Sequence, residues 1–221
     1  MLEGPNRPAL RYGGCAKLRR TASRAALLGT LAALAACASE GERGVPQDIA
    51  GTVHVCSSCH GPAGRSFNAT FPRLAGQQKE YLVTQLKAFR DKTRADPHAH
   101  TYMWGMAAHL SDATIEGLAN YYSAQPPVAG TPGSAADMAA GQAIFRNGIE
   151  AEAVPPCMSC HGEKAEGADG VPRLAGQHQA YLERQLAAFV SLARANEIMH
   201  ETTKNMNEEQ IRQISAYLAA Q

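Results

Sequence analysis

The stretch Cys56-Ser-Ser-Cys59-His60-Gly61 returns later in the chain as Cys157-Met-Ser-Cys160-His161-Gly162. Its surroundings return as well, because residues 71–89 and 171–189 are identical at twelve of nineteen positions when shifted by 100. A chain of 221 residues is long enough for two small domains. The repeat therefore predicts two similar units, each built around one copy of the motif.

The spacing within each motif places two thiols about one helical turn apart, with a histidine directly after the second thiol. Both thiols can then add to one edge of a planar porphyrin, and the histidine lies beneath the ring. Cys-x-x-Cys-His is the attachment signature of c-type haem. The sequence therefore predicts two covalently bound haem c groups. Their attachment residues and proximal iron ligands are Cys56, Cys59 and His60 in the first unit and Cys157, Cys160 and His161 in the second.

Three other uses of paired cysteines explain less of the pattern. A structural zinc site could use two Cys-x-x-Cys pairs, but the histidine and glycine after each pair would then be coincidental. A thioredoxin-like redox motif needs a nearby βαβ pattern, which the sequence does not show. Disulfides within the pairs would leave both histidines unexplained. The two remaining cysteines, Cys15 and Cys37, lie in the N-terminal leader.

The periodicity of the chain predicts helices and no β-strand of useful length. Near the end of each unit, apolar residues at i, i+3 and i+7 form one helical stripe, repeated at a shift of 96. Ser111 and Asn207 precede these closing helices as N-caps, and Gln210 completes a capping box in the second. We expect an all-α fold with two tandem domains, at residues 45–125 and 137–221, joined by a Pro- and Gly-rich linker at 126–136.

The second axial ligand of each iron decides whether a haem only carries electrons or also binds a substrate. The first unit offers five candidates ahead of its closing helix, namely His98, His100, Met103, Met106 and His109. At the shift of 96, Met103 falls on Met199, and none of the other four falls on a residue that could bind iron. Although methionine is more often a core residue than a ligand, this repeated pair predicts His/Met ligation in both units.

Residues 1–37 have the features of an export signal. A basic segment from Lys17 precedes an apolar run of about a dozen residues, too short for a permanent transmembrane helix. The run ends in Leu34-Ala35-Ala36-Cys37, which resembles the lipobox of bacterial lipoproteins. Lipidation of Cys37 would give a membrane-anchored periplasmic protein. Cleavage after Ala38 would instead give a soluble periplasmic one.

The charge distribution disfavours a nucleic-acid partner, and the net charge differs between the two units. The leader carries a net charge of +5 and the rest of the chain −4, so no basic stripe for phosphates is present. Residues 39–125 are neutral overall, whereas residues 126–221 carry the whole −4. Five acids surround the second motif, namely Glu150, Glu152, Glu163, Glu166 and Asp169. Because negative charge stabilises ferric iron, we expect the haem of the second unit to have the lower potential.

These features together resemble the dihaem class I cytochromes c of the c-four type, found in bacterial periplasms. The likeness covers residues 45–221 and rests on the two Cys-x-x-Cys-His-Gly motifs, the repeated Pro-Arg-Leu-Ala-Gly-Gln and a methionine before each closing helix. It implies two cytochrome c folds packed about a pseudo-twofold axis. It also implies that the carbonyls of Pro72 and Pro172 accept the Nδ1–H of the proximal histidines, which fixes their tautomer.

Two further residue pairs are candidates for contact with the haems. Arg73 and Arg173 either pair with a haem propionate or are solvated surface charges. Tyr81 and Tyr181 either donate their hydroxyls to a propionate or pack a helix face on the ring. One departure concerns the first helix: residues 137–145 match the family pattern with Gly141, whereas residues 46–54 lack the equivalent glycine and phenylalanine. We expect that helix to be shorter or packed differently in the first unit.

The expected function is that of a periplasmic electron carrier and not of an enzyme. It would pass electrons from a respiratory donor, a quinol-oxidising complex or a dehydrogenase, to a terminal oxidase or a similar acceptor. Two alternatives remain. A dihaem enzyme, such as a peroxidase or a sulfur-compound oxidase, would need an open or differently ligated iron, which the repeated methionine disfavours. The second alternative is a fixed cytochrome subunit of a larger membrane complex. The sequence leaves this alternative open, because a docking surface carries no motif.

Overall fold

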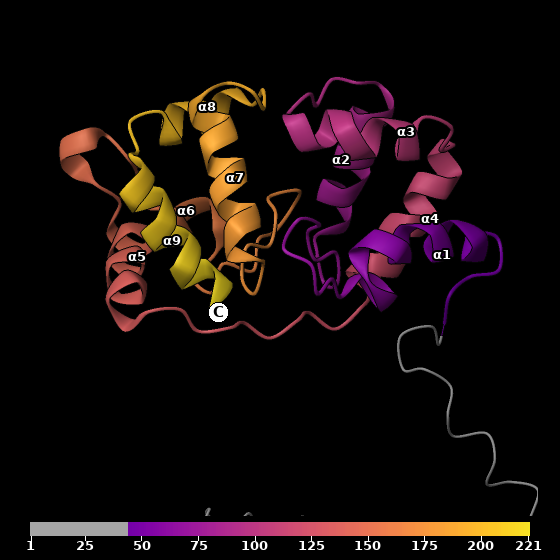
Figure 1. Cartoon of the computed structure of the whole chain (residues 1–221), viewed down its shortest axis with the longest axis horizontal. Helices are drawn as coiled ribbons and strands as arrows, with labels where there is room; N and C mark the ends of the chain where they lie inside the picture. The colour runs from indigo at the N-terminus through magenta and orange to yellow at the C-terminus, as the bar shows by residue number, and fades with distance from the viewer. Residues whose placement is uncertain (1–43) are drawn as a thin grey trace, which may run out of the picture. The chain divides into compact units, whose positions relative to one another are not determined.

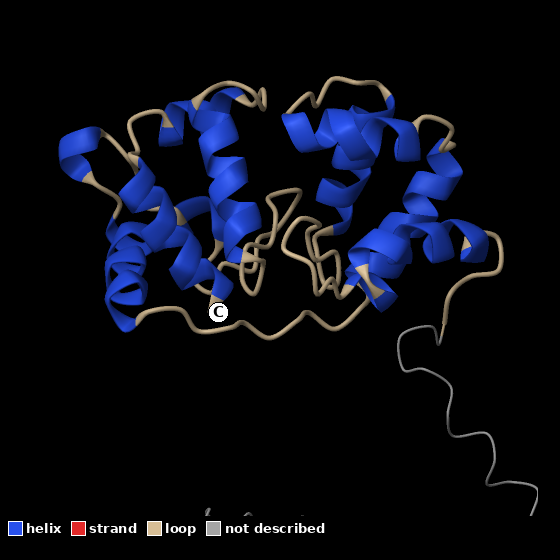
Figure 2. Cartoon of the chain, viewed as in Figure 1, coloured by secondary structure: helices blue, strands red, loops and turns tan. Residues whose placement is uncertain are grey.

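The computed structural model describes residues 44–221, which fall within one compact unit. The predicted leader, including Cys37, lies outside the described residues. Figures 1 and 2 show that the described part is built from helices and loops, with two isolated β-bridges and no strand. The all-α prediction is therefore confirmed. Within the same residues, no helix is both long enough and apolar enough to span a membrane.

Lobe one, the name used here for residues 45–125, begins with the helix that carries the first motif. Its helices pack mainly through α2 against α4 and through α3 against α2. Buried residues of α1, α2 and α4 form its main core, which includes Val53, Leu82 and Leu118. The elements are α1 (Ala50–His60), η1 (Pro62–Gly64), α2 (Lys79–Arg90), η2 (Ala99–Met103), α3 (Trp104–Ala107) and α4 (Asp112–Ser123).

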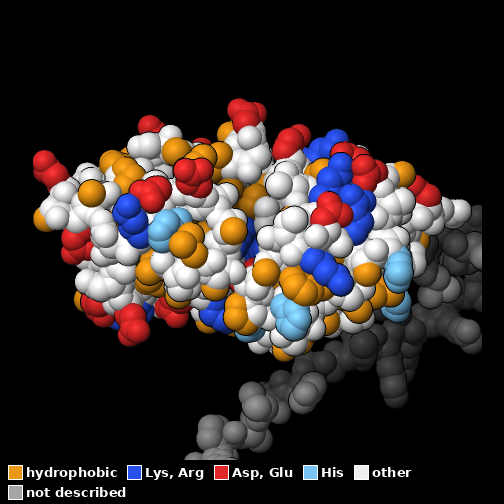
Figure 3. All heavy atoms as spheres, turned by 90° about the horizontal axis from the view of Figure 1, so that it is seen from above, with side chains coloured by type: hydrophobic (Ala, Val, Ile, Leu, Met, Phe, Trp, Pro, Cys, Tyr) orange, Lys and Arg blue, Asp and Glu red, His pale blue; other side chains and the backbone are white. Residues whose placement is uncertain are grey.

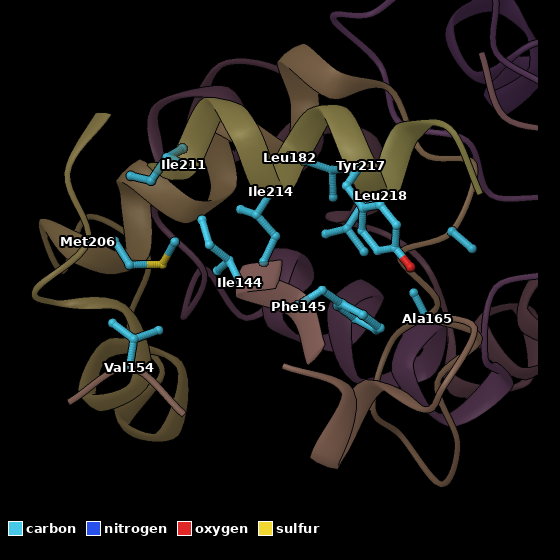
Figure 4. Packing of buried hydrophobic residues seen from close by; sticks show 11 residues of the cluster. Ile144, Phe145, Val154, Ala165, Leu182, Met206, Ile211, Ile214, Tyr217 and Leu218 are labelled. Carbon is cyan, nitrogen blue, oxygen red and sulfur yellow. The ribbon is translucent and has the colours of Figure 1, made fainter. Parts of the chain in front are cut away.

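Lobe two, residues 137–221 with the end of the linker, packs α9 against both α5 and α7. Figure 4 shows this core, in which the ring of Phe145 on α5 faces that of Tyr217 on α9 at 5.5 Å between centroids. Met206 belongs to the same buried cluster. The elements are α5 (Ala135–Asn147), η3 (Glu150–Glu152), α6 (Met158–His161), α7 (Gln179–Val190), α8 (Glu197–Thr203) and α9 (Glu208–Ala219).

The predicted helix starts agree with the structure. The hydroxyl of Ser111 accepts from the amide of Thr114 at the start of α4, and Asn207 with Gln210 forms the full capping box of α9. The first helix of lobe two begins at Ala135, two residues before the expected boundary, because the Ser134 hydroxyl caps it.

In both lobes a glycine allows the first helix and the closing helix to approach closely, but the glycine lies on a different helix in each lobe. In lobe two, a Cβ on Gly141 would lie 2.1 Å from the carbonyl oxygen of Gln213, so the backbones of α5 and α9 approach closely, as expected. In lobe one, a methyl of Ile49, just before α1, lies over Gly117 of α4 at 2.9 Å from where its Cβ would be. Gly117 is the equivalent of Gln213 at the shift of 96. The glycine at the crossing therefore belongs to the first helix in lobe two and to the closing helix in lobe one.

Two buried glutamines join the lobes through reciprocal hydrogen bonds. Gln77 accepts from the Arg173 amide at 2.7 Å and donates to the Arg173 carbonyl at 2.9 Å. Gln177 makes the same two bonds to the main chain of Arg73, both at 2.9 Å. This reciprocity fits the expected pseudo-twofold relation between the lobes. Each buried bond of this kind contributes about 1 kcal/mol to stability.

Candidate haem sites

Both motifs open onto one cavity of about 590 Å³. The side chains of His60 and His161 line it, together with Cys56 and Cys160. Its walls also include apolar side chains from α2 and α7, among which are Leu82, Leu86, Phe89, Leu182, Leu186 and Phe189. A largely apolar cavity with a few convergent polar groups is the usual form of a cofactor site.

The two motif histidines are held in one orientation by main-chain carbonyls. Nδ1 of His60 lies 2.9 Å from the carbonyl oxygen of Pro72, and Nδ1 of His161 lies 3.0 Å from that of Pro172. Because a carbonyl only accepts, Nδ1 must carry the proton, and Nε2 keeps its lone pair. Burial lowers the pKa of both histidines, although the carbonyl bond opposes the shift. Both rings are therefore neutral near pH 7, which is the form that binds a metal.

The four motif cysteines form no disulfide, and each motif pairs a half-buried cysteine with an exposed one. Cys56 and Cys157 are half-buried, whereas Cys59 and Cys160 are exposed. Burial raises the pKa of the Cys157 thiol to about 11 and also raises that of Cys56. Among residues 44–221, no three cysteine, histidine or acidic side chains come together as a metal cluster. The two cysteine pairs are therefore not brought together as the zinc alternative would require.

The paired methionines lie on the wall of the same cavity as the histidines. Met103 ends η2 and Met199 is in α8. Of the other candidates, Met106 is 60% exposed and His100 and His109 are exposed, so these three do not line the cavity. His98 does line it, and its buried Nδ1 has no hydrogen-bond partner.

The remaining candidates for contact with the haems, Arg73 with Arg173 and Tyr81 with Tyr181, also line the cavity. Their contacts differ from those that the sequence predicted. The guanidinium of Arg73 donates to the carbonyl of Gly176 in the other lobe. Nε of Arg173 is buried without a partner, which suits a carboxylate such as a haem propionate. The hydroxyl of Tyr81 lies 2.9 Å from the guanidinium of Arg194, while Tyr181 lines the cavity from lobe two.

The two lobes share a set of largely buried polar residues that the sequence did not predict. Arg94 and Arg194 lie with Gln85, Gln185 and Asp96 in the cavity wall. The signal was present, because Arg94-Ala-Asp96 recurs as Arg194-Ala-Asn196 at the shift of 100. The repeat changes its shift from 100 to 96 within this segment, so aligning it on the closing helices separated the two arginines.

Each lobe thus offers a neutral histidine, a methionine and one cysteine on the wall of the cavity, with the second cysteine of the motif close by in sequence. This set of groups fits a covalently held haem. The orphaned Nε of Arg173 adds a partner for a propionate. Fold and site together define a dihaem c-type cytochrome.

Comparison with known proteins agrees with this class. The family model described as cytochrome c matches twice, at residues 49–124 and 138–221. Cytochrome c-552 of Acidithiobacillus ferridurans is 42% identical over 167 residues, covering 75% of this chain and 73% of that protein. A protein of Thiomonas intermedia named thiosulfate dehydrogenase electron acceptor is 36% identical, covering 75% of this chain and 78% of that one.

The fold also matches that of a solved cytochrome structure. Cytochrome c4 of Acidithiobacillus ferrooxidans superimposes with a TM-score of 0.72 at 42% identity, covering 75% of this chain and 98% of that one. The chain therefore belongs to the cytochrome c family, in its dihaem c4 type. It is an electron-transfer cytochrome with covalently bound haem c, and its partners are redox proteins.

Proposed function

We propose that this chain works as a periplasmic carrier with two closed haem sites, not as a haem enzyme. Its donor is a quinol-oxidising complex or a dehydrogenase, and its acceptor is a terminal oxidase or a similar protein. The observation that supports this is the placement of Met103 and Met199 on the wall of the cavity that His60 and His161 line. A bound haem supplies a one-electron ferric/ferrous couple.

The residues of each site divide the work of holding and tuning the iron. Cys56 and Cys59 would attach the first haem, and His60, oriented by the Pro72 carbonyl, would bind its iron. Met103 supplies a thioether, a soft ligand that favours ferrous iron and raises the potential. The equivalent roles in lobe two belong to Cys157, Cys160, His161, Pro172 and Met199.

The test is to open one site at a time in the purified holoprotein. Haem analysis should give two haems per chain, with six-coordinate low-spin spectra. Met103→Ala should lower the potential of one haem and let the reduced protein bind one equivalent of carbon monoxide, and Met199→Ala should do the same for the other haem. Met106→Ala is the matched control, because this exposed methionine does not line the cavity. Stoichiometric carbon monoxide binding by the unmodified protein would refute the closed-site proposal.

A second candidate function is to accept electrons from a sulfur-oxidising dehydrogenase. The name of the Thiomonas intermedia relative favours it, since that protein is called a thiosulfate dehydrogenase electron acceptor. Mixing the oxidised holoprotein with thiosulfate and a purified thiosulfate dehydrogenase tests this role. Rapid reduction that needs the dehydrogenase supports the carrier role, whereas reduction by thiosulfate alone supports the enzyme alternative.

The location also belongs to the proposal. The predicted export signal places the mature chain in the periplasm, where c-type haem is attached. Lipid on Cys37 would keep it at the membrane surface close to respiratory partners, and cleavage after Ala38 would release it.

A further inference from the structure

Two buried arginines, one in each lobe, donate hydrogen bonds to a glutamine of the opposite lobe. Nη2 of Arg94 donates to Oε1 of Gln185 at 2.7 Å, and Nη2 of Arg194 donates to Oε1 of Gln85 at 2.8 Å. Both guanidinium groups also lie over a phenylalanine ring of their own lobe, at 4.7 and 4.6 Å from the ring centroid. All four polar residues line the cavity that the two haem sites share.

One residue breaks this symmetry. Asp96 is 2% exposed, and its Oδ2 accepts from Nε of Arg94 at 2.9 Å. Its equivalent at the shift of 100 is Asn196, whose side chain accepts from the Met199 amide at 2.9 Å and caps α8. Both residues line the cavity. Within residues 44–221, Asp96 is the only acidic residue that is buried as a whole. One oxygen of Glu152 in lobe two is also buried, but Glu152 does not line the cavity.

The result is a difference in buried charge between the two lobes. The guanidinium of Arg94 has a carboxylate partner, so lobe one holds a neutral ion pair. Arg194 donates to neutral groups, namely Gln185, Gln85 and Tyr81. It attracts the Asp96 carboxylate without pairing with it directly, while Gln185 of lobe two donates to Asp96 at 3.5 Å. Because the arginines repeat and the carboxylate does not, lobe one differs from lobe two by one buried negative charge at the cavity wall.

We propose that Asp96 sets the two haem potentials apart by holding the haem of lobe one at the lower potential, while Asn196 leaves the haem of lobe two at the higher one. The inference rests on the proposed function, since it needs a closed haem in each lobe. A negative charge near the iron stabilises the ferric form, and the effect is strongest where water is excluded. Asp96 belongs to lobe one and lies seven residues before Met103.

This order reverses the one expected from counting charges along the sequence. Of the five acids around the second motif, Glu150, Glu163, Glu166 and Asp169 are exposed and Glu152 is partly exposed. On the face seen in Figure 3, acidic side chains border lobe two, whereas Lys and Arg gather over lobe one. Solvent and salt screen such surface charges, whereas the Asp96 carboxylate is shielded from both.

The test exchanges the two residues in the full holoprotein. Asp96→Asn should raise the ferrous-to-ferric ratio of the lobe-one haem at a fixed ambient potential. The change is about tenfold for an effective dielectric near 20 and a separation of about 12 Å. Asn196→Asp should lower the same ratio at the lobe-two haem, and aspartate still caps α8. The double exchange should reverse the order in which the haems are reduced, followed haem by haem by NMR.

The control is Glu163→Gln, which removes an exposed acid next to the second motif and should shift either haem far less. Equal shifts at both haems, or no shift, would overturn the proposal. A lower thermal midpoint for Asp96→Asn with both potentials unchanged would likewise assign the residue to folding alone. Failure of the proposed function is visible separately, because an open iron binds carbon monoxide whatever stands at position 96.

Discussion

Three helix glycines give a graded test of how closely the helices approach. Gly141 and Gly117 occupy the crossings of lobe two and lobe one, while Gly51 lies on the exposed side of α1. We consider alanine at each position. In a helix, alanine is favoured over glycine by about 0.5–1 kcal/mol, so any loss of stability must come from the added methyl group.

The distance from the added methyl carbon to its nearest neighbour determines whether each substitution raises or lowers the free energy of unfolding. At Gly141 the new carbon would lie 2.1 Å from the Gln213 carbonyl oxygen, a backbone atom that moves only if α5 and α9 separate. Overpacking of this kind costs about 1–3 kcal/mol, which exceeds the gain in helix propensity. At Gly117 the contact is a methyl of Ile49 at 2.9 Å, which can shift partly. At Gly51 nothing lies within 4 Å.

Urea unfolding followed by far-ultraviolet circular dichroism measures the three variants. We expect Gly51→Ala to be as stable as the parent or slightly more so, Gly117→Ala slightly less, and Gly141→Ala less by about 1–2 kcal/mol. For Gly141→Ala the urea midpoint should fall by roughly 0.5–1 M with little change in slope. The reasoning is refuted if Gly141→Ala unfolds at the same midpoint as Gly51→Ala.

Two other predictions concern pH and the leader. His178 lies 3.0 Å through Nε2 from the Ser66 carbonyl, and burial, with Arg73 nearby, lowers its pKa. Since the unfolded chain then binds a proton more readily, the free energy of unfolding should fall as the pH drops below about 6.5, and His178→Gln, which copies Gln78 of lobe one, should flatten this slope. An identical slope in both proteins would contradict the assignment. For the leader, Cys37→Ser should move the mature protein from the membrane to the soluble fraction, and mass spectrometry that finds an unmodified N-terminus at Ser39 would exclude lipidation.

The repeat carried most of what the sequence could predict. The two motifs and the shared stretch after them were enough to indicate two helical haem lobes, because covalent attachment needs fixed spacing along the chain. The polar contacts between the lobes were not predictable in the same way. Gln77 and Gln177 sit within the shared stretch, but nothing local indicates that each bonds the main chain of the opposite lobe. Asp96 was overlooked because its significance lies in a difference from Asn196, not in a motif.

The contacts between the lobes also support the histidines. Gln177 holds both the amide and the carbonyl of Arg73, the residue directly after Pro72. The Pro72 carbonyl is the group that fixes the Nδ1 proton of His60. Gln77 holds Arg173 in the same manner, next to the proline that orients the histidine of lobe two. The peptide that positions each proximal histidine is therefore fastened by a glutamine from the other lobe, and separating the lobes would loosen both sites at once.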